Sequence, residues 1–172
     1  DVPLFLSGHL HVQHCKRSDE NRGIWEMVTA SLATPSCKYA ILTYRDDRSF
    51  LYRTRSLDVE GWAKKNKRTE EDLLHFKKFQ TPFLRRVFYN QAIAALNNVS
   101  DITDSEREQM AQLYSLLKYH YYQGTAYQVQ DLVRNDPAYA LWQEEGMATQ
   151  QGDYFEYILR DGVQDYNRLE VD

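Results

Sequence analysis

The stretch Leu57-Asp58-Val59-Glu60-Gly61-Trp62 separates two parts of the sequence that differ in their hydrophobic pattern. Before it, short apolar runs rich in β-branched and aromatic residues alternate with turn-forming clusters, which is typical of strands. After it, apolar residues recur at spacings of three and four, which indicates amphipathic helices. We therefore expect an α+β fold with two domains, residues 1–62 and residues 63–172.

The N-terminal part contains four runs with strand character, separated by clusters of Asp, Ser, Gly and Pro that favour turns. The runs cover residues 4–12, 24–32, 39–44 and 50–57, and the turn clusters cover 19–23, 34–36 and 45–49. Because the runs are short and follow one another closely, we expect antiparallel neighbours in a meander at the edge of a larger sheet.

The C-terminal part carries several helix start and stop signals. Thr69 with Asp72 and Thr103 with Glu106 resemble capping boxes. Asp136-Pro137 predicts an N-cap followed by Pro at the first helical position, and Pro82 predicts a kink or break. Gly124 predicts the end of a helix, and Gly152-Asp153 predicts a new start. We expect the last helix to run from residue 154 to residue 166.

Composition excludes several classes of protein. The 172 residues contain no apolar run near the roughly 20 residues of a membrane helix, so no membrane span is expected. Residues 100–172 carry five basic and fourteen acidic side chains, which would repel phosphates, so no nucleic-acid partner is expected. Cys15 and Cys37 could pair or remain free thiols, which leaves the redox compartment open.

Three of the five histidines lie in His9-Leu10-His11-Val12-Gln13-His14. In an extended chain, side chains two residues apart point to one face, so His9 and His11 would stand about 6–7 Å apart. That spacing suits two imidazoles that reach two metal ions about 3.5–4 Å apart. Gly8 would permit an unusual φ or a close approach of the backbone to a ligand.

The stretch from Pro3 to His14 closely resembles the G-H-x-H block of calcineurin-like metallophosphoesterases. The segment 24–32, Pro35 and the segment 39–42 resemble the strands that follow this block in bacterial members of the family. The helical extension resembles that of bacterial proteins related to class III cyclic nucleotide phosphodiesterases. The resemblance implies the C-terminal strands of a metallophosphoesterase αββα sandwich, followed by an all-helical domain.

The resemblance also implies a chemistry. His9 would bind the second and His11 the first of two divalent ions (Mn, Fe or Zn), and the reaction would be hydrolysis of a phosphoester or nucleotide, cyclic nucleotides among them. His14 would either line the substrate pocket or lie on the surface. We expect His75 and His120, which fall in helical segments, to be packed or solvated rather than ligands.

The other motifs of that family, D-x-H, G-D-x-x-D and G-N-H-D/E, do not occur in the 172 residues. We therefore expect the sequence to be the C-terminal piece of a longer protein, and its start at Asp1 without Met agrees with this. The piece alone would be inactive and would bind metal weakly. Its strands would lack the missing N-terminal part of the protein as a partner, which favours a homodimer or aggregation.

An alternative from another class is a non-catalytic helical module for protein interaction, with a small β meander. The sequence contains 13 Tyr, and Tyr119, Tyr121 and Tyr122 lie within one helical turn. Tyrosines are enriched at protein interfaces as well as in cores. In the alternative, a tyrosine-rich surface binds the partner. A zinc site at His14 and Cys15 is disfavoured, because the paired C-x2-C arrangement of structural zinc sites is missing.

Overall fold

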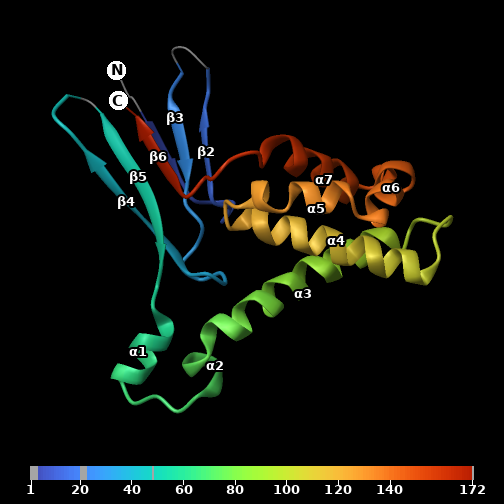
Figure 1. Cartoon of the computed structure of the whole chain (residues 1–172), viewed down its shortest axis with the longest axis horizontal. Coiled ribbons are helices and arrows are strands. Elements are labelled where there is room, and N and C mark those ends of the chain that lie inside the picture. The colour runs from blue at the N-terminus through green and yellow to red at the C-terminus, as the bar shows by residue number, and fades with distance from the viewer. Residues whose placement is uncertain (1–3, 20–22, 48, 172) are drawn as a thin grey trace. The chain divides into compact units, whose positions relative to one another are not determined.

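The computed structural model describes residues 4–19, 23–47 and 49–171 (Figure 1). The chain forms two compact units. The sheet unit consists of residues 1–81, 122–124 and 165–172, and the helical unit consists of residues 82–121 and 125–164. The expected α+β class is confirmed, whereas the division into residues 1–62 and 63–172 stays a prediction.

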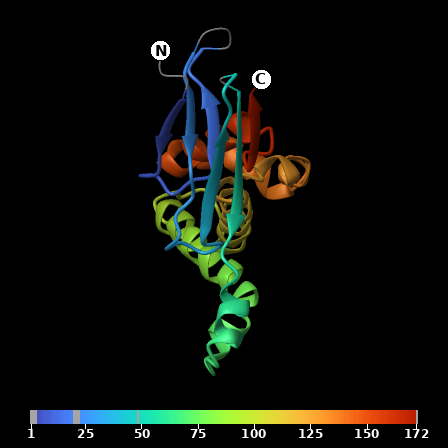
Figure 2. The ribbon, with the colours of Figure 1, turned by 90° about the vertical axis from the view of Figure 1, so that its left-hand side faces the viewer.

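The sheet unit contains two three-stranded sheets, sheet A in the order β1-β3-β2 and sheet B in the order β4-β5-β6. Figure 2 shows the blue strands of sheet A beside the teal and red strands of sheet B. The strands and the short helices of this unit are β1 (Leu4–Ser7), β2 (His14–Arg17), β3 (Trp25–Val28), β4 (Lys38–Tyr44), β5 (Phe50–Ser56), α1 (Val59–Lys65), α2 (Glu71–Leu74) and β6 (Arg168–Val171).

The expected meander is correct for only part of the sheet unit. β4 and β5 form an antiparallel hairpin, as expected. In sheet A, however, β1 pairs in parallel with β3, and β2 lies antiparallel on the other side of β3. The run predicted over residues 4–12 ends at Ser7, and a separate strand, β2, begins at His14. A turn between them reverses the chain, so β2 returns beside β3.

Side chains from both sheets form one buried cluster. Sheet A contributes Cys15 and Met27, and sheet B contributes Phe50 and Tyr52. Tyr166, just before β6, completes the cluster at 5% exposure. Removing these apolar surfaces from water at about 25 cal/mol per Å² is what holds the two sheets against each other.

The helical unit takes in most of the long helix α3 (Phe76–Leu96), whose first residues belong to the sheet unit. Its other helices are α4 (Asp104–Tyr122), η1 (Ala126–Gln128), α5 (Gln130–Arg134), α6 (Pro137–Glu144), η2 (Gly146–Ala148) and α7 (Gln150–Asp161). None of the helices in the described ranges combines the length and the apolar character that a membrane crossing needs.

Aromatic side chains fill the core of the helical unit. The Trp142 ring stacks on Phe155, with centroids 5.2 Å apart and planes 12° apart. Tyr114 lies beside both rings. The Trp142 indole donates its N–H to the carbonyl oxygen of Met110 at 2.9 Å, so the polar atom of this buried ring is satisfied.

Three of the helix signals are confirmed. Thr103 and Glu106 form a reciprocal capping box, in which the Glu106 N–H donates to Thr103 Oγ1 at 3.2 Å and the Thr103 N–H donates to Glu106 Oε2 at 2.7 Å. Asp136 caps α6 by accepting from the Ala138 N–H at 2.9 Å. Gly124, with a φ of 70°, follows the end of α4.

One other signal is wrong, and a second is wrong in part. Thr69 makes no capping box, because α2 begins at Glu71 without a side-chain cap. Pro82 does not break α3, which runs unbroken from Phe76 to Leu96, and a kink at this residue stays a prediction. Pro82 lacks the N–H that would bond back along the helix, and the boundary between the two units falls at this residue.

The end of the chain also differs from the expectation. The last helix, α7, begins at Gln150 rather than at residue 154, because Thr149 Oγ1 accepts from the Gly152 N–H at 3.1 Å. Gly152 lies inside this helix, where a Cβ would come within 2.2 Å of the Gly146 carbonyl oxygen. α7 ends at Asp161. Residues 162–166, which were expected to continue the helix, lead instead to β6, which pairs with β5.

Candidate functional site

The histidine pair lies directly after the carboxyl end of β1. Because β1 and β3 are parallel, their carboxyl ends share one edge of sheet A. The Thr29 N–H donates to the Ser7 carbonyl oxygen at 3.1 Å and ties the two chain segments together there. The edge where parallel strands end is a common position for binding sites in α/β folds.

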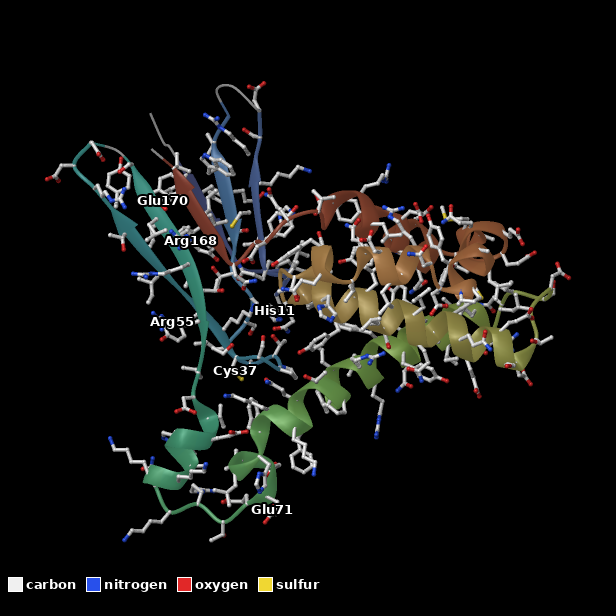
Figure 3. All side chains as sticks on the ribbon, viewed as in Figure 1. His11, Cys37, Arg55, Glu71, Arg168 and Glu170 are labelled. Atoms are coloured by element: carbon white, nitrogen blue, oxygen red, sulfur yellow. The ribbon has the colours of Figure 1, made fainter. Side chains whose placement is uncertain are left out.

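His9 and His11 belong to a turn, not to an extended segment. The His11 N–H donates to the Gly8 carbonyl oxygen at 3.3 Å, and His11 has a φ of 57°. The spacing of about 6–7 Å, which assumed extended backbone, therefore does not apply. Both side chains are exposed, and Figure 3 labels His11 beyond the end of β1. Their role as metal ligands stays a prediction.

The presence of glycine at position 8 is not explained by an unusual backbone conformation. Its φ is not positive, and a Cβ built on it would have the Thr29 carbonyl oxygen, at 3.9 Å, as its nearest neighbour. The expectation of an unusual φ is therefore wrong. The open space beside Gly8 leaves room for a group from outside these residues to approach the backbone.

Gln13 holds the turn at Gly8–His11 (the histidine turn) in place, and its role was not predicted from the sequence. Its side chain is fully buried. Gln13 Nε2 donates to the Tyr166 carbonyl oxygen at 2.8 Å and to the Tyr52 hydroxyl at 3.0 Å. Its Oε1 accepts from the Ala30 N–H at 3.3 Å, and its own N–H donates to the Tyr122 carbonyl oxygen. A buried amide with this many partners fixes the backbone two residues after His11.

His14 lies two residues farther from the turn than the pair does. It is the first residue of β2, only 8% exposed, so the expected position on the surface is wrong. Its ring lies against the Tyr166 ring, with centroids 4.2 Å apart. Its assignment to a substrate pocket stays a prediction.

The two cysteines are free thiols. Burial, followed by the charge of Asp165, raises the pKa of Cys15 to about 12, so this thiol is protonated at neutral pH. Its Sγ donates to the Tyr166 carbonyl oxygen at 3.6 Å. A protonated, buried thiol suits a packing role rather than a ligand role. Burial also raises the pKa of Cys37.

The remaining histidines are packed or solvated, as expected. His75 is exposed and lies 3.4 Å from the Glu71 carboxylate. The His120 ring shares a hydrogen bond of 3.0 Å with the Thr125 hydroxyl. Burial, then the charge of Arg85, lowers the pKa of His120, so its ring is neutral at physiological pH.

Within residues 4–19, 23–47 and 49–171, no three His, Cys, Asp or Glu side chains gather in a way that could hold a metal ion. His9 and His11 therefore fit a metal centre only as two of its ligands. A divalent transition metal in a protein usually has at least three protein ligands. The participation of His9 and His11 in such a site stays a prediction.

Comparison with protein families identifies the helical region. Residues 58–165, more than half of the chain, match the family described as the C-terminal domain of cyclic nucleotide phosphodiesterase. The chain therefore belongs to this family. The matched range begins after the histidine turn, so it covers neither His9 nor His11. A comparison with curated proteins found no match.

Proposed function

We propose that this chain is the C-terminal part of a phosphodiesterase with two divalent metal ions, in which His9 binds the second ion and His11 the first. One observation carries the proposal: the exposed imidazoles of His9 and His11 lie on a turn at the carboxyl end of a parallel strand, and the fully buried Gln13 holds this turn in place. Membership of the family described as the C-terminal domain of cyclic nucleotide phosphodiesterase supports the reaction class.

The chemistry assigned to the chain's own residues is limited. His9 and His11 each offer one ring nitrogen as a ligand, and the bonds of Gln13 hold the turn that presents them. When bound, the ions (Mn, Fe or Zn) would activate a water molecule and hold the phosphoryl oxygens of a phosphodiester, such as a cyclic nucleotide. Because the sequence resembles bacterial metallophosphoesterases, we expect its source to be a bacterium.

The other ligands would come from an N-terminal part of the same protein. The exposed surface of sheet A supports this part of the proposal. Among the described residues β1 pairs with β3 alone, and Phe5 and Leu6, which point to opposite faces, are 58% and 55% exposed. Such an apolar edge strand favours pairing with further chain.

An activity assay tests the proposal. The natural protein that contains these residues would be assayed with a chromogenic bis-aryl phosphodiester and with a cyclic nucleotide, with Mn²⁺ added. His9→Ala and His11→Ala should each reduce kcat/KM by about 100-fold or more, because each removes a ligand of the reacting centre.

His75→Ala is the matched control, since this exposed histidine lies on another segment and should leave the activity unchanged. The residues 1–172 alone should hydrolyse neither substrate. Full activity of His9→Ala or His11→Ala would remove the basis of the proposal.

A second candidate is the interaction module. Its original basis is partly wrong, since Tyr121 is buried and donates its hydroxyl proton to Asp161 Oδ2 at 2.9 Å. Other apolar side chains now favour it: Phe83 and Val87, one turn apart on α3, are 63% and 38% exposed. If they form a homodimer contact, Phe83→Ser should convert dimers to monomers in light scattering. A chain that is already monomeric at high concentration would contradict this candidate.

A further inference from the structure

A cavity lies within the helical unit. Its volume is about 590 Å³, within the range of small-molecule sites. It is lined by side chains of α3, α4 and α7: Gln91, Tyr114, Lys118, Gln150, Gln151, Asp153, Tyr154 and Tyr157. Tyr114 and Lys118 are buried, whereas Asp153 and Tyr157 are exposed and stand at its mouth.

Lys118 is a buried cation without a counter-charge. Its side chain is 9% exposed, and no carboxylate among the described residues lies within ion-pair distance of it. Its ammonium donates to Gln91 Oε1 at 2.8 Å and to the Tyr114 hydroxyl at 3.0 Å. An ammonium has three N–H donors, so one remains beyond these two acceptors.

The aromatic rings around Lys118 stabilise its charge only in part. The Lys118 Nζ lies 5.0 Å from the ring centroids of Phe88 and Tyr154 and 5.1 Å from that of Tyr114. Such cation–π contacts contribute about 0.5–2 kcal/mol each. Burial still lowers the pKa of Lys118 to about 8, so the charged form is poorly compensated.

We propose that this cavity binds a small organic carboxylate, whose anionic group accepts the third hydrogen bond of the Lys118 ammonium. The first turn of α7 supports an anion there, because Gln150 and Gln151 begin this twelve-residue helix and its N-terminus carries partial positive charge. The side-chain amides of Gln150 and Gln151 supply further donors.

Asp153 selects the charge of the ligand. The cavity lining carries one cation, Lys118, and one carboxylate, Asp153. A monoanion is compensated by Lys118, whereas a phosphate dianion would bring a second negative charge toward Asp153. The Tyr154 and Tyr157 rings, stacked with centroids 6.0 Å apart, form an aromatic wall for a flat apolar body. Benzoate is therefore a suitable probe.

The test is an NMR titration of the 172-residue chain with benzoate at constant ionic strength. Saturable shifts should appear at the amides of Gln91, Lys118, Gln151 and Tyr154. Benzamide, the neutral isostere, should not produce them, and phenylphosphonate should bind more weakly than benzoate. The absence of saturable benzoate shifts, equal binding of benzamide, or tighter binding of phenylphosphonate would overturn the proposal.

Two variants and one control sharpen the result. Lys118→Met should weaken benzoate binding at least tenfold, while Lys78→Met, which removes an exposed lysine, should bind as the original chain does. Asp153→Asn should strengthen benzoate binding and admit phenylphosphonate. Benzoate binding unchanged in Lys118→Met, or weakened in Asp153→Asn, would contradict the assignment.

If Lys118→Met does not fold, the unsubstituted chain still decides the question. Bound benzoate should raise the pKa of the Lys118 ammonium, measured on its own side-chain nitrogen resonance, because an anion favours the charged form. The ionisable groups that face this ammonium are Asp153, Tyr154 and Tyr157 from α7 and Tyr114 from α4; α3 contributes the neutral Phe88 and Gln91. An unchanged pKa at saturating benzoate would exclude contact with Lys118.

Discussion

The helical unit packs Trp142, Tyr114 and Phe155 against one another, whereas the sheet unit places polar side chains in its interior. Gln13 is buried there, and so is Lys38, whose ammonium donates to the Gln123 carbonyl oxygen at 2.6 Å and to Asn167 Oδ1 at 2.5 Å. The contrast teaches that the aromatic core of the helical unit depends mainly on burial of apolar area, whereas the sheet unit adds satisfied hydrogen bonds to its apolar cluster.

The difference also matters for function. An apolar core tolerates changes that keep volume and shape, while a polar network loses stability when any partner is left unsatisfied. In the sheet unit that network lies directly below the turn that carries His9 and His11. The proposed metal ligands therefore rest on hydrogen bonds rather than on apolar packing.

The largest effect on stability is expected in the helical unit. Trp142→Ala should lower the free energy of unfolding by about 3–5 kcal/mol, because it removes a fully buried ring and the hydrogen bond from its indole N–H to the Met110 carbonyl oxygen. Trp62→Ala, at a tryptophan that is 51% exposed, should cost about 0.5 kcal/mol. Urea denaturation measures both, and equal costs would remove the distinction between core and surface.

A smaller loss is expected from the polar interior of the sheet unit. Gln13→Ala should cost about 2–3 kcal/mol, since the buried Ala30 N–H loses its acceptor and the Tyr166 carbonyl oxygen keeps only the weak Cys15 thiol donor. Gln109→Ala, at an exposed glutamine, is the matched control and should change stability by about 0.5 kcal/mol or less. If Gln13→Ala were equally harmless, the sheet unit would not depend on this network.

The smallest expected effect is the difference in stability between two Gly→Ala variants of the sheet unit. Gly124→Ala should cost about 1–2 kcal/mol, because Gly124 has a φ of 70° and a Cβ would lie 2.7 Å from Gln13 Cγ. Gly8→Ala should leave the stability nearly unchanged, since nothing lies closer than 3.9 Å. Thermal unfolding compares the two variants, and a costly Gly8→Ala would show that the space beside the histidine turn is not open.

Local signals predicted a good part of the fold, because they depend on neighbours in sequence. The capping box of Thr103 and Glu106, the cap at Asp136 and the stop at Gly124 involve residues within a few positions of one another. β6 could not be predicted in this way, because Arg168–Val171 is a strand only through its pairing with β5. The parallel pairing of β1 and β3 likewise depends on the return of the chain through β2.

For the candidate site, too, only the features that depend on local sequence could be predicted. His9 and His11 were proposed as ligands from a local motif of four residues and the strand pattern around it, and this assignment stays a prediction. The role of Gln13 was not predictable, because its partners Tyr52 and Tyr166 lie 39 and 153 positions away in the sequence. The turn at Gly8–His11 was also missed, since the alternation of apolar and polar residues favoured extended backbone.

The metal content of the natural protein tests the central claim most directly. Elemental analysis after exhaustive dialysis would compare the unsubstituted protein with His9→Ala, His11→Ala and the control His75→Ala. The account predicts that each of the first two variants loses a bound divalent ion or holds it much more weakly, and that His75→Ala keeps the full content. Full metal content in both His9→Ala and His11→Ala would contradict the account, because these two side chains would then not be ligands.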